Sequence, residues 1–249
     1  MTDKPDIVDE SAPGELPNDF ITLNPPLMPT HTKSLIAVFY CSTMIAVLLG
    51  WAYYYLVLEV SWLIWLLPLE LFGLAYAFLI TSIIFVKIVV IILEKKCPPR
   101  EGVFERDGRE QQYYQARMFF KYYAIWLSRN STFPWLDAFT YKLFGVKVGT
   151  TVVLHEARVD TEFVEIGDYT MVGMHSQVMS HLLYQDAFVV KKTIIGDNCI
   201  VGAYGSVAPG TRMGDESVIG AIAGTLIDQE IEAKSLNVGF PARKVRGIE

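Results

Sequence analysis

Two long apolar stretches occupy the first part of the chain. Residues 34–58 contain no charged side chain, and a second stretch covers residues 63–93. The second stretch is interrupted only by Pro68, Glu70, Gly73 and Lys87. At a rise of ~1.5 Å per residue, each stretch is long enough to cross a hydrocarbon core of about 30 Å. Because only residues 59–62 separate the two stretches, the pattern predicts a transmembrane helical hairpin over residues 34–97.

Positive charges flank this hairpin but not its turn. Lys33 precedes the first stretch, whereas Lys95, Lys96 and Arg100 follow the second. Cationic flanks are retained on the cytoplasmic side of a membrane. We therefore expect an integral membrane protein with both termini in the cytoplasm.

After residue 97 the apolar pattern gives way to a mixture of aromatic and basic residues. Between Tyr113 and Phe144, aromatic side chains are interspersed with Arg117, Lys121, Arg129 and Lys142. This mixture is typical of helices that lie in the headgroup region of a bilayer, and Pro134 would break one helix from the next. We expect interfacial amphipathic helices over residues 98–145.

From residue 146 onward, an aliphatic residue recurs at every sixth position and is often followed by glycine. The residues that open these units are Val148, Leu154, Asp160, Ile166, Val172, Val178, Ile195, Val201, Val207, Met213, Ile219, Thr225, Ile231 and Asn237. Fourteen units keep one phase apart from a single break, which indicates a repeat architecture. Each unit supplies one short strand and a turn, so three units complete a triangular coil whose opening residues point inward.

Two openers do not fit an apolar interior. Asn237 lies at the end of the array, where repeats are expected to become atypical. Asp160 lies inside the array, and the pattern provides no explanation for a carboxylate there.

Composition adds further constraints. Residues 1–33 hold six acids and six of the twelve prolines, which predicts a disordered tail. This tail lacks the basic region of a secretory signal peptide. The net charge of −6 and the adjoining apolar stretches argue against a nucleic-acid partner. The three cysteines are isolated, as expected for a reducing compartment.

The six-residue period resembles the hexapeptide-repeat acyltransferase superfamily. The resemblance implies an α+β fold class: the transmembrane hairpin and interfacial helices, then a left-handed parallel β-helix over residues 146–242 and a basic tail over 243–249. Residues 34–249 also look like the carboxy-terminal part of membrane-bound nonribosomal-peptide-synthetase-like proteins of the ε-poly-lysine synthetase type, although this chain has no adenylation or carrier domain.

The break in the repeat marks a candidate active site. His181 is the fourth residue of its unit, and residues 184–194 leave the coil before the count resumes. In the acetyltransferases that this chain resembles, a histidine just before such an excursion is the general base, a task for which imidazole is suited. Asp186 is the nearest candidate to orient this base. Glu156 or Asp160 from a neighbouring subunit is the alternative.

The resemblance also implies where an acyl-CoA donor would bind. Arg243 and Arg246 match the family's terminal segment that reaches the phosphates of coenzyme A, and guanidinium groups suit phosphate geometry. Backbone contacts with the pantetheine arm carry over to Ala203 and Ala221. Where the family commonly has Thr-Lys, this chain has Leu226 and Ile227, which removes one phosphate contact.

A metal site is the less favoured interpretation of the histidines. Zinc needs three protein ligands plus water, and γ-class carbonic anhydrases of this fold bind it through histidines. His175 and His181 are six residues apart, so they fall on successive faces rather than forming that family's close pair. We therefore expect no metal, and we interpret His31, His155 and His175 as surface residues.

These features lead to one principal hypothesis and two alternatives. The first is a homotrimeric acyltransferase that moves an acyl group from a thioester to a hydroxyl or amine, such as a lipid headgroup, at the cytoplasmic membrane face. The second is a non-catalytic trimeric membrane scaffold. The third is an amide-forming condensation module that works with a separate carrier protein.

Overall fold

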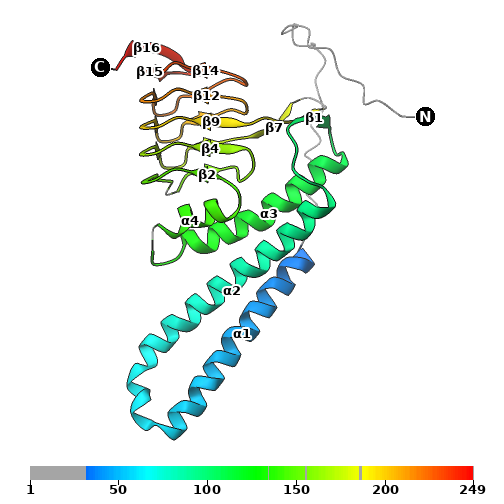
Figure 1. Ribbon diagram of the computed structural model, residues 1–249, viewed down its shortest axis with the longest axis vertical. Helices are drawn as coiled ribbons and strands as arrows, with labels where there is room; N and C mark the ends of the chain where they lie inside the picture. Colours follow the sequence, from blue (N-terminus) through cyan, green and yellow to red (C-terminus); the bar gives the residue numbers. More distant parts are fainter. Residues whose placement is uncertain (1–31, 134, 155, 185–186, 249) are drawn as a thin grey trace, which may run out of the picture.

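The computed structural model describes residues 32–133, 135–154, 156–184 and 187–248. It consists of a helical hairpin, two further helices and a stack of short strands (Figure 1). The helical elements are α1 (Thr32–Glu59), the 3-10 helix η1 (Ser61–Leu66), α2 (Leu67–Lys96), α3 (Arg109–Arg129) and α4 (Leu136–Leu143). The predicted disordered tail lies almost entirely outside the described residues.

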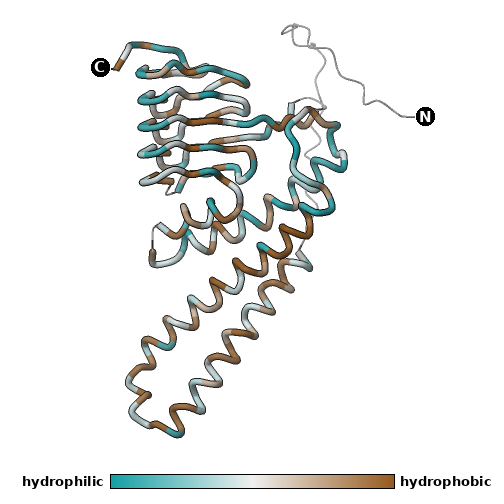
Figure 2. Tube along the Cα trace, viewed as in Figure 1, coloured by the Kyte–Doolittle hydropathy of each residue, from teal (hydrophilic) through white to brown (hydrophobic). Residues whose placement is uncertain are grey.

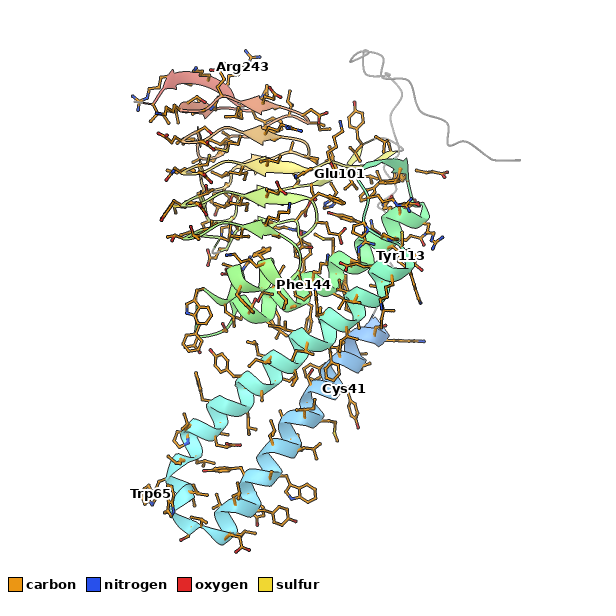
Figure 3. All side chains as sticks on the ribbon, viewed as in Figure 1. Cys41, Trp65, Glu101, Tyr113, Phe144 and Arg243 are labelled. Carbon is orange, nitrogen blue, oxygen red and sulfur yellow. The ribbon has the colours of Figure 1, made fainter. Side chains whose placement is uncertain are left out.

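Helices α1 and α2 run antiparallel, and η1 closes the hairpin at the end farthest from the strands (Figure 1). Trp65 lies at this tip (Figure 3). Both helices are apolar along most of their length (Figure 2) and are long enough to cross a membrane. Few of their side chains are buried: 11% in the apolar window of the first helix and 28% in that of the second. Most side chains in these two apolar windows are therefore not buried within the chain itself.

The strands form three parallel faces of a β-helix, which confirms the predicted parallel coil. The first face contains β2 (Lys147–Val148), β4 (Val164–Ile166), β9 (Thr193–Ile195), β12 (Arg212–Met213) and β14 (Glu230–Ile231). The second contains β5 (Met171–Val172), β10 (Ile200–Val201), β13 (Val218–Ile219) and β15 (Ser235–Val238), and the third contains β3 (Arg158–Val159), β6 (Gln177–Val178) and β11 (Ser206–Val207). The chain visits the three faces in this order in every coil.

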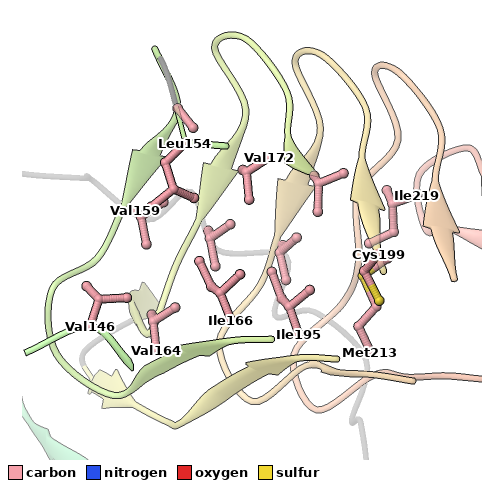
Figure 4. Close-up of a cluster of buried hydrophobic side chains, with 14 of the residues drawn as sticks. Val146, Leu154, Val159, Val164, Ile166, Val172, Ile195, Cys199, Met213 and Ile219 are labelled. Atoms are coloured by element: carbon pink, nitrogen blue, oxygen red, sulfur yellow. The ribbon is translucent and has the colours of Figure 1, made fainter. Parts of the chain in front are cut away.

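The interior of the β-helix follows the predicted pattern. Opening residues such as Ile166, Val172 and Ile195 are at most 3% exposed and stack in the core (Figure 4). The fifth positions are small and equally buried, as at Thr170, Ser176, Cys199, Thr211, Ser217 and Ala223. Stacked coils thus share a continuous core that no single repeat could bury alone.

A column of aspartates explains why glycine follows the openers of the first face. The Oδ1 atoms of Asp168, Asp197 and Asp215 each accept a hydrogen bond from a backbone N–H of the coil before. A Cβ atom at Gly167 would lie 2.2 Å from Oδ1 of Asp197, closer than any side chain tolerates. Glycine is therefore required for the coils to stack at this corner.

The structure corrects the sequence register around Asp160. Val159, not Asp160, pairs with Val178 and points into the core, where it is fully buried. The unit that opens at Leu154 has five residues, and the next has seven before Ile166 resumes the period. The missing residue of the first unit and the extra residue of the second cancel, so the six-residue period looks unbroken from Leu154 to Ile166. Asp160 consequently lies at a corner of the coil rather than in its core.

Two segments outside the repeat array also differ from expectation. The segment expected to hold only interfacial helices contains a strand, β1 (Gly102–Glu105), which pairs with β8 (Ala187–Val190). The expected basic tail instead forms β16 (Arg243–Gly247), antiparallel to β15. Both strands satisfy their backbone groups on an existing sheet edge, a long-range partner that local composition does not reveal.

Helix α3 lies between the hairpin and the β-helix and contacts both. Phe120 and Ala124 pack in one cluster with residues of α2. On the other side, Arg117 forms a bidentate ion pair with Glu162 (2.7 and 2.9 Å), and Lys121 Nζ lies 2.8 Å from the same carboxylate. Burial raises the pKa of Glu162, but the bonds from Arg117 and Lys121 outweigh it and hold this pKa below its usual range. Instead of lying freely in an interface, α3 joins the two halves of the molecule.

Candidate active site

His181 lies where the backbone leaves the coil. At this fourth position of a unit, the chain usually turns with a left-handed φ of 53° to 58°. Residues that do so are Tyr169, His175, Asn198, Tyr204, Glu216, Ile222, Asp228 and Lys234. His181 instead begins β7 (His181–Tyr184), which forms an antiparallel sheet with β8 and β1. The extended backbone thus carries the chain outward and starts the predicted excursion.

The imidazole of His181 is held by a buried carboxylate of the same chain. Nδ1 lies 2.5 Å from Oδ2 of Asp160, whose side chain is only 4% exposed. Asp160 belongs to the preceding coil at the same corner, so stacking of the two coils brings the pair together. The contact is within one chain, whereas the alternative given above placed this acid on a neighbouring subunit. The favoured candidate, Asp186, lies outside the described residues.

Neighbouring groups keep Asp160 charged. Its Oδ2 accepts a hydrogen bond from the Ser180 backbone N–H at 2.7 Å, and Oδ1 accepts one from the Tyr122 hydroxyl at 2.9 Å. Burial raises the pKa of this carboxyl, but the hydrogen bonds from His181, Ser180 and Tyr122 lower it by more than burial raises it. The pKa of Asp160 is therefore below its usual range. The ionised Asp160 carboxylate accepts a hydrogen bond from the Nδ1–H group of His181, so Nε2 is the ring nitrogen directed away from this carboxylate.

Two aromatic rings fix the plane of the imidazole. The rings of Tyr114 and Phe188 lie 4.8 and 5.9 Å from that of His181. The Tyr114 hydroxyl is 3.0 Å from Nδ1 and 3.3 Å from Ser180 Oγ. Burial, and then the charge of Asp160, raises the pKa of Tyr114 well above its ordinary value, so this phenol stays neutral. Within the described residues, Nε2 makes no hydrogen bond.

An apolar cavity of about 410 Å³ opens beside His181. Met118, Phe119 and Tyr122 of α3 form its wall, and Leu35 of α1 lies at its border. The His181 side chain is 34% exposed, and its Nδ1 edge is held by Asp160. The Nε2 edge is therefore the part of the ring open to a ligand.

The other predicted histidines do not join this site. His175 lies at the corner between the second and third faces, where its ring lies 5.3 Å from that of Tyr204 in a tilted arrangement. Glu156 lies at the same corner, where its carbonyl accepts the His175 N–H, and it does not contact His181. His31 and His155 lie outside the described residues. No group of three metal-binding side chains occurs in the part of the chain that the structure describes.

The residues expected to bind a donor lie elsewhere on the β-helix. Ala203 and Ala221 follow β10 and β13 on successive coils, at the corner of His175. Among the described residues, no acceptor lies within hydrogen-bond reach of either alanine N–H. Arg243 and Arg246 are exposed on β16, at the end of the β-helix farthest from the hairpin (Figure 3).

Sequence reasoning missed the aromatic part of the site. Tyr114 and Tyr122 of α3 contact His181 and Asp160, but we interpreted this stretch as membrane-facing. Their eight-residue spacing places them on one helix face. This spacing is the sequence feature that could have indicated a shared contact.

No protein-family model matches the chain. The putative acetyltransferase YvoF from Bacillus subtilis (strain 168) is 24% identical over 139 residues, which cover 52% of this chain and 80% of that protein. The maltose O-acetyltransferase from Clostridium difficile 630 superimposes with a TM-score of 0.49 and 17% identity over 60% of this chain and 94% of that one. The hexapeptide-repeat acetyltransferase VCA0836 from Vibrio cholerae, solved with acetyl coenzyme A, gives 0.46 and 17% over 59% and 93%. These proteins are acetyltransferases, and a coenzyme A thioester is bound in the last of them.

Proposed function

We propose that the chain is an acyltransferase in which His181 is the general base. The observation that supports this most directly is the 2.5 Å contact between Nδ1 and the buried Asp160 carboxylate, which leaves Nε2 unprotonated beside an open cavity. The similarity to YvoF points to the same chemistry.

In the proposed reaction, the hydroxyl or amine of the acceptor attacks the carbonyl carbon of the thioester. Nε2 of His181 takes the proton from the attacking group, and Asp160 stabilises the imidazolium that forms. A carbon–oxygen or carbon–nitrogen bond forms as the carbon–sulfur bond breaks. The departing thiolate then takes the proton back from Nε2, so the base is regenerated.

Coenzyme A is the proposed donor. The free N–H groups of Ala203 and Ala221 lie one coil apart and suit the carbonyl groups of a pantetheine arm. Arg243 and Arg246 would bind its phosphates. An aminoacyl group on a separate carrier protein is the alternative donor, and assays with both thioesters distinguish the two.

A homotrimer fits the placement of these groups. His181 lies at the corner between the third and first faces of the β-helix. Ala203 and Ala221 lie at the corner between the second and third faces, so one chain holds the candidate base and the proposed donor contacts at different corners. A donor that lies along the alanine corner would meet His181 from an adjacent copy.

The apolar hairpin supports a membrane location. Its exposed side chains, such as Trp51, Leu69 and Ile80, need an apolar surrounding. With Lys95 and Lys96 at its inner end, the β-helix would lie on the cytoplasmic face, and the acceptor would be a molecule of the membrane surface. A scaffold without catalysis is the competing hypothesis, favoured by exposed Leu226 where the family has a polar residue.

The decisive experiment compares His181→Ala with His175→Ala in the full-length protein. Loss of a general base costs about 10² to 10⁴ in rate, so His181→Ala should abolish measurable acetyl transfer to a hydroxyl or amine acceptor. His181→Ala also removes a partner of the buried Asp160 carboxylate, so thermal unfolding must show that the variant is folded at the assay temperature. His175→Ala should retain activity. Equal rates in the two variants would favour the scaffold.

A further inference from the structure

The cavity beside His181 connects the candidate base to the first turns of the membrane hairpin. His181 lies at one border, and Leu35, the fourth residue of α1, lies at another. Between them, Met118 and Phe119 supply an apolar wall. A volume of about 410 Å³ falls in the range of sites that bind small ligands.

Position within the hairpin indicates which kind of ligand can enter. Lys33 precedes Leu35, and residues 34–58 carry no charge, so Leu35 lies where an apolar helix would enter the bilayer. With the hairpin in a bilayer as proposed above, a molecule that reaches His181 past Leu35 would come from the membrane. Water in such an apolar space would find few hydrogen-bond partners.

On the basis of the proposed function, we propose that this cavity holds the alkyl chain of an amphiphilic acceptor whose hydroxyl or amine group lies at Nε2 of His181. The transferred acyl group comes from the thioester, and the acceptor proton goes to Nε2 as described above. The donor is the poorer candidate for this cavity, because its phosphates are matched by Arg243 and Arg246 on β16, at the opposite end of the β-helix.

The first test measures transfer from acetyl coenzyme A to n-alkylamines, from ethylamine to dodecylamine, with the full-length protein in phosphatidylcholine nanodiscs. Burial of each added methylene should raise kcat/KM by about fourfold until the cavity is filled. Gln115→Trp, whose side chain would enter the cavity, should remove most of this dependence on chain length. Gln112→Trp, one turn earlier on the exposed side of α3, is the matched control. Partitioning of the amines into the nanodisc affects both variants equally.

A second readout does not depend on catalysis. Dodecylamine with a terminal diazirine should label peptides that contain Leu35 or Phe119, and unlabelled dodecylamine should compete. Labelling without transfer to any n-alkylamine or to the n-alkanols of the same lengths would support the cavity and reject the proposed acyltransferase. Transfer with equal dependence on chain length in Gln115→Trp and Gln112→Trp, and no labelling at α3, would reject the cavity and leave the acyltransferase standing. Labelling that appears only after removal of residues 1–31 would identify the tail as the occupant and overturn the proposal.

Discussion

At His181, the buried partner of Nδ1 decides which nitrogen can receive a proton. The carboxylate of Asp160 accepts a hydrogen bond from Nδ1, so Nε2 is the ring nitrogen left for the proposed proton transfer. The Ser180 N–H and the Tyr122 hydroxyl hold that carboxylate in place. The state of His181 therefore depends on a residue that never reaches the acceptor.

Asp160→Asn tests this dependence. The amide group would donate to Nδ1 instead of accepting from it, which places the ring proton on Nε2 and blocks its role as a base. We expect kcat/KM for acetyl transfer to fall by about 10² to 10⁴, with an altered pH profile.

Asp168→Asn is the matched control for this prediction. Asp168 is a partly exposed aspartate whose carboxylate also accepts a hydrogen bond from a backbone N–H, but it lies at a different corner. It should leave the rate unchanged. If Asp160→Asn retains the wild-type pH profile, Asp160 has only a structural role.

His181 could be selected as the candidate base from the sequence, but its contact with Asp160 could not. His181 was marked by the break in the period, which is a local signal. Asp160 was recognised only as an opener that did not fit, because the five-residue and seven-residue units around it cancel in the count. Tyr114 and Tyr122 contact the pair from a helix that is distant in sequence, and no period connects them.

Among the elements, β16 carries the two arginines proposed to bind donor phosphates. Loss of a charge-assisted hydrogen bond is worth roughly 1.5 to 3 kcal/mol. The double variant Arg243→Ala/Arg246→Ala should weaken acetyl coenzyme A binding by about ten- to a hundred-fold, measured by calorimetry. Lys244→Ala, on the same strand but paired with Glu232, is the control and should bind normally. Unchanged binding in the double variant would exclude β16 from the donor site.

Helix α3 depends on a buried ion cluster for its position. In this cluster, Arg117 and Lys121 bind the carboxylate of Glu162. Because folding lowers the pKa of Glu162, the cluster stabilises the protein at a pH above the usual glutamate pKa. That contribution should be lost as the pH falls below about 4.3 and through the lowered pKa. Thermal unfolding in detergent between neutral and acidic pH measures the loss.

Glu162→Gln should lower the free energy of unfolding at neutral pH by about 3 to 5 kcal/mol, because Arg117 remains buried without its carboxylate and Lys121 keeps only the longer contact with Glu94 at 3.4 Å. The variant should also show a shallower acid dependence. Glu165→Gln, which removes an exposed pair with Lys147 and Lys192, should cost at most about 1 kcal/mol. Equal losses in the two variants would show that the buried cluster does not hold α3.

Periodic elements were predictable, and elements that depend on distant partners were not. The coil strands follow from openers such as Val172 and Val201, whose six-residue spacing is written in the sequence. Strand β1 exists because β8 presents an edge to Gly102–Glu105, more than eighty residues earlier in the chain. Strand β16 likewise follows from the free edge of β15.

For the whole molecule, the direction of the hairpin is the main prediction. The turn at Glu59 has no Lys or Arg near it, whereas Lys95 and Lys96 end α2, so the turn should face outward. Glu59→Cys, in a Cys41→Ala background, should react with a membrane-impermeant maleimide on intact cells. Lys95→Cys should react only after permeabilisation. The reverse pattern would place the β-helix outside.

The firm attachment of α3 to both the hairpin and the β-helix limits the symmetry of any assembly. With every hairpin in the same bilayer and every β-helix fixed to its own hairpin, copies can be related only by rotation about the membrane normal. In the proposed membrane location, a two-fold axis in the membrane plane would place one β-helix on the wrong side. An assembly of the proposed membrane-anchored protein would therefore be a cyclic ring, with all candidate active sites at one height above the lipid.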